Sequence, residues 1–539
     1  MTRIRRGNHR TAIAAVILVG VLAVVLRLWG IRFGLPNVLA HPDESRVAHT
    51  AVGFLSGALH PGFFNYPSLF MYVTGALDAA YCGALMAVGT FDSLDACAAS
   101  WPWGWEPFFL IPRFLSAAAG VATVAVLFFM VRRLTDDDAA GLAASVLLAS
   151  SFLHVRDSHF GVTDVSMTFL LVSAVALLLL AHDCPMLRGF ALAGLVTGLA
   201  TSTKYNAALL ALSAIVSALA AWRAGDRHAL LRIPIFGVMM VTGFVAGTPY
   251  AALDPQRFWI DASSEATHLG AGHGLNLGPG WVYHATTTLR HGVTLPVLGA
   301  AVVGLVAAFR MRSWRAAIVF AFPIAYYIVA GHGETVFARY MIPMVPFVCA
   351  AAGLLIALAV RTLTRSTAHG ATTLIVAALV ALAVGSLSLW KCVQLDRLLN
   401  RTDSRVLAAE WLLQQGSAGE TVYISGSHNG RPDLFVRGKP GPLTVVTFDP
   451  QAQVFRNPDG GEVPSPQWIV VQQSPLIQYS HVPEAITHRL RDYDLRHSVR
   501  AVNMNQPHVY DQQDAWFLPL AGFDGVARPG PNLSIYRRR

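Results

Sequence analysis

AIAAVILVGVLAVVLRLW, residues 12–29, is an almost unbroken apolar run that follows a basic amino terminus. As a helix, a run of this length crosses the hydrocarbon core of a bilayer, which is about 30 Å thick. It lacks a clear small-residue cleavage site, which favours an uncleaved membrane span over a signal peptide. Similar runs recur, so we expect a polytopic α-helical membrane protein with about eleven spans. The expected spans are residues 12–29, 108–131, 139–155, 164–182, 189–203, 205–222, 234–250, 292–310, 315–330, 340–360 and 371–390.

The composition supports this class of protein. Of 539 residues, 54% are hydrophobic and only 13% are charged, and the mean hydropathy is +0.48. These values exclude an ordinary soluble enzyme. The net charge of +9 would suit a nucleic-acid partner, but most of the excess lies in short Arg clusters between the apolar runs. Such clusters are typical of the cytoplasmic loops of membrane proteins, so we expect no nucleic acid.

The same Arg clusters predict the orientation. They all fall on one side of the membrane if residues 68–88 do not make a full crossing, so we expect that run to be re-entrant or juxtamembrane. The amino terminus is then cytoplasmic and the carboxyl terminus lies outside, as in a multi-pass protein of the bacterial plasma (inner) membrane. The tryptophans of 101–105 suit an interfacial aromatic belt. Cys82 and Cys97 could pair only in an extracytoplasmic loop, and free thiols are the favoured interpretation.

After about residue 391 the composition changes. Residues 403–415 form an amphipathic pattern typical of a helix, and a second helix is expected at 483–492. Alternating and β-branched residues predict strands at 421–425, 443–447 and 468–471. We therefore expect two domains, a membrane domain at 1–390 and an extracytoplasmic soluble α/β domain at 391–539. The latter contains no GxGxxG motif, no P-loop and no hydrolase elbow.

Acidic residues lie just outside two expected spans. His41-Pro42-Asp43-Glu44 follows the first span, and Asp164 opens another. Carboxylates are costly to hold near lipid, so they call for a function, such as taking a proton from a hydroxyl or binding a cation. The alternative is structural. Asp is a preferred N-cap, so Asp43 could cap an amphipathic helix at 44–59 and Asp164 could cap its own span.

Three cations, Arg156, Lys204 and Arg339, are expected at the same outer face. They could be side chains that snorkel from helix ends toward water. They could instead form a phosphate clamp, because fixed cations stabilise the charge that develops on a leaving phosphate. Lys204 lies between two short apolar runs, which is an unusual place for a residue that only snorkels.

These positions together resemble the GT-C glycosyltransferases, in particular the family 39-like branch of protein O-mannosyltransferases and aminoarabinose transferases. The resemblance covers residues 1–360. It implies a GT-C membrane fold, a polyprenyl-phosphate sugar as donor, Asp43 as general base and Asp164 as the acid of the second outer loop. The motifs that carry it are His41-Pro42-Asp43-Glu44, Phe63-Phe64-Asn65-Tyr66-Pro67-Ser68-Leu69, Arg156 with Asp164, Gly198-Leu199-Ala200 through Lys204-Tyr205, and Arg339-Tyr340-Met341-Ile342-Pro343-Met344-Val345-Pro346.

The chain departs from that pattern at one motif. Asn65-Tyr66-Pro67-Ser68 stands where the aminoarabinose branch has Glu-Lys-Pro-Pro, so the lysine thought to meet the donor phosphate is missing. The donor contact must then come from elsewhere. The β-trefoil inserts of the eukaryotic mannosyltransferases are absent too, so neither the sugar nor the acceptor carries over.

We therefore expect an inverting glycosyltransferase. It would move a sugar from a polyprenyl-phosphate carrier in the bilayer to an extracytoplasmic acceptor, which could be a cell-envelope glycan, a lipid or a protein. One alternative is an oligosaccharyltransferase-like enzyme with a divalent metal at Asp43, Glu44 and Asp164; another is a polyprenyl-lipid transporter or flippase. No cofactor is required in the first interpretation. The expected site residues are Asp43, Glu44 and Asp164 for catalysis and Tyr66, Arg156, Lys204, Arg339 and Tyr340 for the donor.

Overall fold

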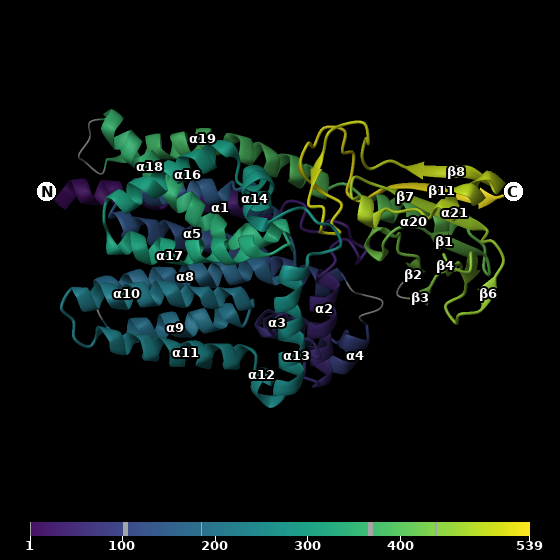
Figure 1. Cartoon of the computed structure of the whole chain (residues 1–539), viewed down its shortest axis with the longest axis horizontal. Helices are drawn as coiled ribbons and strands as arrows, with labels where there is room; N and C mark the ends of the chain where they lie inside the picture. The colour runs from purple at the N-terminus through teal and green to yellow at the C-terminus, as the bar shows by residue number, and fades with distance from the viewer. Residues whose placement is uncertain (1, 101–105, 185, 365–369, 437–438) are drawn as a thin grey trace. The chain divides into compact units, whose positions relative to one another are not determined.

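The computed structural model describes residues 2–100, 106–184, 186–364, 370–436 and 439–539 (Figure 1). The aromatic belt expected at 101–105 lies outside these residues. By their internal contacts the described residues form two compact units. The first consists of 1–28, 57–77 and 112–393, and the second of 29–56, 78–111 and 394–539. Each unit is assembled from distant pieces of the chain, and the boundary expected near residue 390 stays a prediction.

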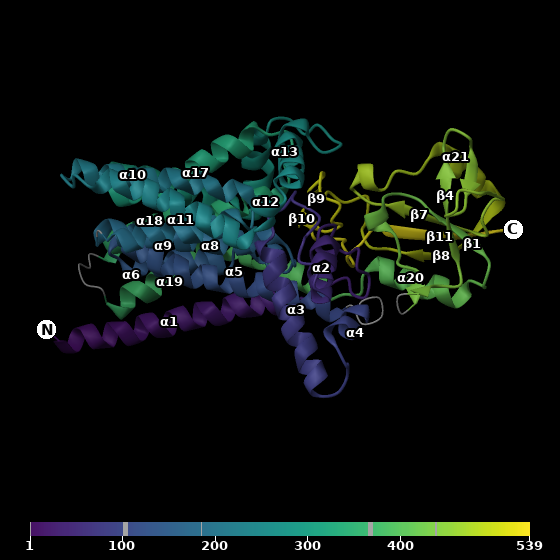
Figure 2. The ribbon, with the colours of Figure 1, turned by 90° about the horizontal axis from the view of Figure 1, so that it is seen from below.

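The first unit is a bundle of apolar helices, seen from a second direction in Figure 2. Every expected span coincides with one of them. Eight helices of the described part are long and apolar enough to cross a membrane, or nine if one bent pair is a single span, and three apolar helices are shorter. The predicted fold class, a polytopic helical membrane protein, is confirmed. The bundle helices are α1 (Thr2–Leu28), α5 (Glu106–Thr135), α6 (Asp138–Ala149), α8 (Thr163–Asp183), α9 (Leu187–Thr201), α10 (Ala211–Arg223), α11 (Arg232–Gly247), α16 (Leu295–Arg310), α17 (Trp314–His332), α18 (Val345–Thr364) and α19 (Ala371–Leu399).

Short helices connect these spans. Two 3₁₀ turns matter for the site: η2 (Tyr205–Leu210), which follows α9, and η5 (Ala338–Met344), which precedes α18. The helix α13 (Pro255–Ala271) belongs to the loop after α11, and Asp254 caps it by accepting from the backbone N–H of Arg257 at 3.2 Å. The other connecting helices are α7 (Phe152–Asp157), η3 (Ala229–Leu231), α12 (Tyr250–Leu253), α14 (Gly280–Tyr283), η4 (His284–Leu289) and α15 (Arg290–Gly292).

The run at 68–88 forms one continuous helix, α3 (Leu69–Ala87). It is long and apolar enough to cross a bilayer. Length and composition alone do not decide whether it crosses, so the expected re-entrant or juxtamembrane course stays a prediction. After it, α4 (Leu94–Ala99) returns and brings Cys97 to Cys82, and the two form a disulfide with 5.9 Å between their Cα atoms. The expectation of free thiols at these positions is wrong. The disulfide joins helices α3 and α4, whose cysteines are 15 residues apart in the sequence.

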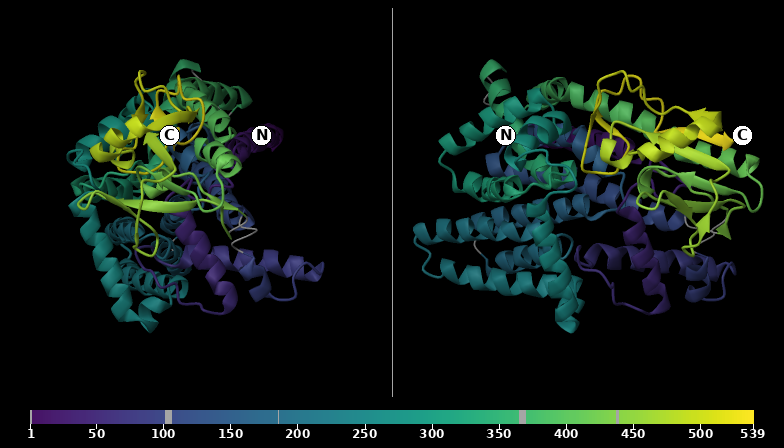
Figure 3. Two further views of the ribbon diagram at one scale, coloured as in Figure 1. Left: turned by 90° about the vertical axis from the view of Figure 1, so that its right-hand side faces the viewer. Right: turned by 45° about the vertical axis from the view of Figure 1, so that its right-hand side comes forward.

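The carboxyl-terminal part of the second unit is built on one sheet, visible in Figure 3. Its strand order is β6-β5-β4-β1-β7-β11-β8. The central strands β4, β1 and β7 are parallel, and β11 and β8 extend the sheet in antiparallel fashion. The strands are β1 (Thr421–Ile424), β4 (Thr444–Asp449), β5 (Val454–Arg456), β6 (Glu462–Val463), β7 (Trp468–Gln473), β8 (Tyr493–Val499) and β11 (Asn532–Arg538). Two small hairpins lie outside it, β2 (Phe435–Val436) with β3 (Lys439–Pro440) and β9 (Val509–Tyr510) with β10 (Pro519–Ala521).

Helices cover both faces of this sheet. Leu412 of α20 (Ser404–Gln415) packs with Val422, Val470 and Ile535, and Ile486 of α21 (Glu484–Arg489) packs with the opposite residues of the same strands. Successive residues of a strand point to opposite faces, which explains the alternation. The predicted strands at 421–425, 443–447 and 468–471 and the helix at 403–415 match β1, β4, β7 and α20. The α/β class of this region is confirmed.

Candidate functional site

The best-formed cluster of the predicted residues lies at one end of the first unit. Asp164 stands in the first turn of α8, where a helix dipole favours negative charge. Lys204 follows the end of α9, in extended backbone with φ −155° that leads into η2. The polar run Thr201-Ser202-Thr203-Lys204 thus follows the apolar part of α9, and its lysine lies between α9 and η2. Tyr340 lies in η5.

Lys204 and Asp164 form a buried ion pair. The Lys204 ammonium donates to Asp164 Oδ1 at 2.6 Å, and the two side chains are only 11% and 3% exposed. The ammonium also lies 5.0 Å from the centroid of the Tyr340 ring. A lysine carries three N–H donors, and one of them is used by Asp164. The carboxylate therefore holds the cation in place and leaves donors for a ligand.

Beside this pair is a cavity of about 380 Å³. One part of its wall is apolar, with Ala208, Leu209 and Leu269, and the other part is polar. A cavity of this size with a few placed polar groups is typical of small-molecule sites. The polar side chains that line it are Asn65, Tyr66, Lys204, Tyr205, Asn206, Glu265, Tyr326 and Tyr340.

Hydrogen bonds fix the walls of the cavity. The Tyr326 hydroxyl accepts from the Asn206 amide at 2.9 Å and donates to the Tyr340 carbonyl at 2.8 Å. The Tyr205 hydroxyl donates to the Phe64 carbonyl at 2.7 Å, just before Asn65 and Tyr66. These bonds join α17, η2, η5 and the segment after residue 57. The wall is therefore held before any ligand arrives, which lowers the entropic cost of binding.

The predicted donor residues divide into two groups. Tyr66, Lys204 and Tyr340 line the cavity. Arg339 does not line it: the residue is 8% exposed, and its guanidinium lies 4.5 Å from the centroid of the Phe337 ring at the same turn. Arg156 does not line it either: it is 1% exposed in α7, and its Nη1 lies 3.8 Å from Asp157 Oδ2. Its predicted contact with the donor stays a prediction.

Asp43 and Glu44 belong to the second unit, at the start of α2 (Glu44–Gly53) and its 3₁₀ extension η1 (Phe54–Ser56). The Asp43 side chain makes no capping hydrogen bond to this helix. Its own backbone N–H donates to Nδ1 of His41 at 3.3 Å, and Glu44 is 1% exposed. The structural alternative for Asp43, a helix cap, is therefore not what the geometry supports.

Sequence reasoning missed Glu265. This residue of α13 lines the cavity, and its carboxylate makes no hydrogen bond or ion pair within the part of the chain that the structure describes. Residues 258, 262, 265 and 269 recur at helical spacing and share one face of a helix. This periodicity could have indicated that Glu265 faces inward. As for metal, no three His, Cys, Asp or Glu side chains among the described residues lie together as ligands.

Comparisons with known proteins identify the fold. A family profile described as dolichyl-phosphate-mannose-protein mannosyltransferase matches residues 110–251, the segment that contains Arg156, Asp164 and Lys204. The structure of ArnT from Cupriavidus metallidurans in the apo state matches with a TM-score of 0.56 and 15% identity, over 97% of this chain and 98% of that chain. The same protein bound to undecaprenyl phosphate matches with a TM-score of 0.51 and 14% identity, over 97% of both chains.

A weaker likeness is to the oligosaccharyltransferase of Archaeoglobus fulgidus, with a TM-score of 0.48 and 15% identity. This chain covers 62% of the length of that protein, and 77% of this chain is matched. No curated protein matches the sequence. Because the match to ArnT runs along nearly the whole chain, the protein shares the fold of that structure, and the fold expected from the resemblance is confirmed.

Proposed function

We propose that this protein is an inverting glycosyltransferase that moves a sugar from a polyprenyl-phosphate carrier to an acceptor on the outer face of a bacterial plasma membrane. The observation that carries the proposal is the cavity at the helix ends. It is lined by Lys204, held by Asp164, together with Tyr66 and Tyr340. A fixed ammonium in a partly apolar cavity suits a phosphate at the level of the lipid headgroups.

The reaction is a single displacement. Asp43 takes the proton of the acceptor hydroxyl while its oxygen attacks the anomeric carbon of the sugar. The bond between that carbon and the phosphate oxygen breaks, and the polyprenyl phosphate leaves with the electron pair. Negative charge grows on the phosphate as the bond breaks, and Lys204 and Arg339 stabilise it. Attack from the face opposite the leaving group inverts the anomeric centre.

An apolar groove suits the polyprenyl chain. A second cavity of about 380 Å³ lies among α16, α17 and α18 and is lined by residues such as Val302, Ile324 and Val348. The helix α17 borders both cavities, with Tyr326 on the polar one and Tyr327 on the apolar one. A donor with its headgroup beside Lys204 and its chain along α17 would use both. Glu265 is then placed to accept hydrogen bonds from the sugar hydroxyls.

The donor assay tests this proposal. We expect the purified protein in lipid to transfer sugar from a polyprenyl-phosphate sugar and not from a nucleotide sugar. The phosphate of such a donor fits the polar cavity, and its lipid chain fits the apolar one. Product is measured as loss of the lipid-linked sugar and gain of glycosylated acceptor. Transfer from a nucleotide sugar in a lipid-free assay would refute the donor class, and movement of intact lipid without bond cleavage would favour the flippase alternative.

Treatment with a chelator distinguishes the proposed enzyme from the metal-dependent alternative. The basic residues neutralise a lipid monophosphate without a metal, so activity should persist after treatment with EDTA. Activity that disappears and returns with Mg²⁺ or Mn²⁺ would favour the oligosaccharyltransferase-like enzyme, which would bind its ion through oxygen ligands.

The orientation has its own test. Asp164 and Cys184 stand at opposite ends of α8, and Cys184 is exposed. The Arg clusters predict that the Cys184 end is cytoplasmic. A membrane-impermeant maleimide should therefore label Cys184 only in inverted vesicles or broken cells. In a Cys184→Ser background, Ser263→Cys on the exposed side of α13 should be labelled in intact cells. The reverse labelling pattern would contradict the proposal that the site lies on the outer face. The Cys82–Cys97 disulfide agrees with an oxidising outer compartment.

A further inference from the structure

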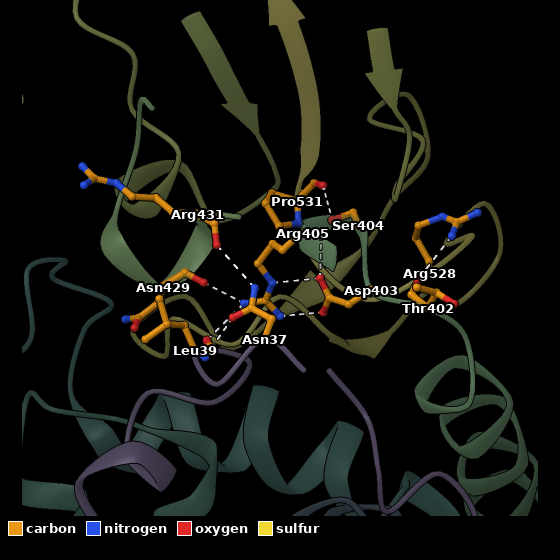
Figure 4. Close-up of polar contacts among 10 residues, drawn as sticks. All are labelled: Asn37, Leu39, Thr402, Asp403, Ser404, Arg405, Asn429, Arg431, Arg528 and Pro531. Carbon is orange, nitrogen blue, oxygen red and sulfur yellow. Dashed lines mark hydrogen bonds and ion pairs between the residues drawn. The ribbon is translucent and has the colours of Figure 1, made fainter. Parts of the chain in front are cut away.

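A buried arginine ties the carboxyl-terminal region to the segment that carries Asp43. Arg405, in the first turn of α20, is 2% exposed, and Asp403 before it is 1% exposed. The guanidinium grips this carboxylate twice, with Nε to Oδ1 at 2.8 Å and Nη2 to Oδ2 at 2.6 Å (Figure 4). Oδ1 also accepts the backbone N–H of Arg405 at 2.8 Å. Two-point binding of this kind fixes the orientation of the guanidinium as well as its position.

The free edge of the guanidinium faces two backbone carbonyls. Nη1 donates to the carbonyl of Asn429 at 2.6 Å and to the carbonyl of Leu39 at 3.2 Å. Asn429 follows β1, whereas Leu39 lies 366 positions before Arg405 and four before Asp43. Figure 4 shows the guanidinium of Arg405 directed toward both residues. The contact therefore joins the start of α20, the turn η6 (His428–Gly430) after β1, and the segment 29–56.

Hydrogen bonds of Asn37 also fix the conformation of the segment 29–56 near this contact. The Asn37 side chain accepts the N–H of Leu39 at 2.9 Å, and its amide donates to the carbonyl of Arg431 at 3.4 Å. Further along, the His41 ring lies 6.0 Å from the ring of Trp516, centroid to centroid. His41 in turn accepts the N–H of Asp43. The carbonyl of Leu39 is thus held by Arg405, and two residues further along the chain His41 contacts Trp516 and the backbone of Asp43.

We propose that Arg405 is a positioning residue for the transfer reaction, and that positioning the segment of Asp43 and Glu44 is a function of the carboxyl-terminal region. The proposal rests on the function proposed above. A base must lie within hydrogen-bond reach of the proton that it takes, and a displacement of about 1 Å can cost 10²-fold in rate. The segment between α1 and α2 contains turns but no helix or strand, so contacts such as those at the carbonyl of Leu39 help to set where Asp43 stands.

The test compares two conservative changes in the full-length protein in lipid. Arg405→Lys keeps the charge but cannot hold Asp403 and both carbonyls at once. We expect kcat to fall by about ten-fold or more while KM for the donor stays within about two-fold, because Arg405 does not touch the donor. Hydrogen exchange in peptides from 29–56 should accelerate. The matched control is Arg528→Lys, which alters a hydrogen bond to the carbonyl of Thr402 instead of one to the segment.

Asn37→Ala tests the same contact through a residue of the segment itself. The proposal can therefore still be tested if Arg405→Lys fails to fold. It should also accelerate exchange in 29–56 and lower kcat, with exchange in the strands of the sheet unchanged. Wild-type exchange in 29–56 together with wild-type kcat in either folded variant would overturn the proposal. If Asp43→Asn keeps its turnover, the catalytic assignment fails instead, and the exchange data still report whether Arg405 holds the segment.

Discussion

Asp43→Asn should lower turnover by about 10²–10⁴-fold, because an amide cannot take the proton of the acceptor hydroxyl. The change preserves the size of the side chain. Asn is as good an N-cap as Asp, so stability should change by at most about 1 kcal/mol. The measurement is kcat with a polyprenyl-phosphate sugar at saturation, alongside a thermal unfolding curve.

Asp95→Asn is the matched control for that experiment. Asp95 is an exposed acid in the first turn of α4, in the same unit of the structure. It should have near-normal turnover. A well-folded Asp43→Asn protein with wild-type kcat would leave Asp43 without a catalytic role.

The second large effect concerns the buried pair of Lys204 and Asp164. Lys204→Met should reduce kcat/KM for the donor by about 10–150-fold, since loss of a charged hydrogen-bond partner costs about 1.5–3 kcal/mol. It should also destabilise the protein, because it leaves a buried carboxylate without its partner, a change that costs about 3–5 kcal/mol. The double variant Lys204→Met/Asp164→Leu removes both charges and should recover most of the lost stability.

The double variant separates function from folding. If the ammonium meets the donor phosphate, the double variant is stable and remains slow. If the pair only holds α8 to η2, stability and activity recover together, which would contradict the proposed role. Lys391→Met is the matched control: Lys391 is a second buried lysine, 4.2 Å from the centroid of the Phe152 ring, and it does not line the donor cavity.

Local patterns predicted most of the fold. Apolar runs of span length had to become helices, because only helices satisfy their own backbone in lipid. The parallel strands β1, β4 and β7 are short β-branched runs and were predicted, whereas β8, with its exposed charged residues, was not. Its place depends on pairing with β11, from Leu533 opposite Val499 onward, and such pairing is not visible in either segment alone.

The site was predictable where a residue type was unusual for its surroundings. Asp164 and Lys204 were predicted because charges at helix ends in a membrane protein are costly, although their pairing at 2.6 Å was not. Glu265 was missed because a glutamate in a polar loop is ordinary, and only the fold turns that face of α13 toward the cavity. The disulfide and the Arg405 contact were beyond reach for the same reason: each joins segments whose proximity only the folded chain creates.

The assembly of the second unit from three separate stretches limits how this protein can exchange parts with relatives. A recombination that replaced only residues 394–539 would bring in a foreign partner for Leu39 and Asn37 while keeping the native segment that they belong to. The mismatch would lie where Arg405 meets the carbonyl of Leu39 and where the Asn37 amide meets the carbonyl of Arg431. Functional hybrids should therefore be those in which residues 29–56 and 394–539 come from the same parent, although more than 300 codons separate the two in the gene.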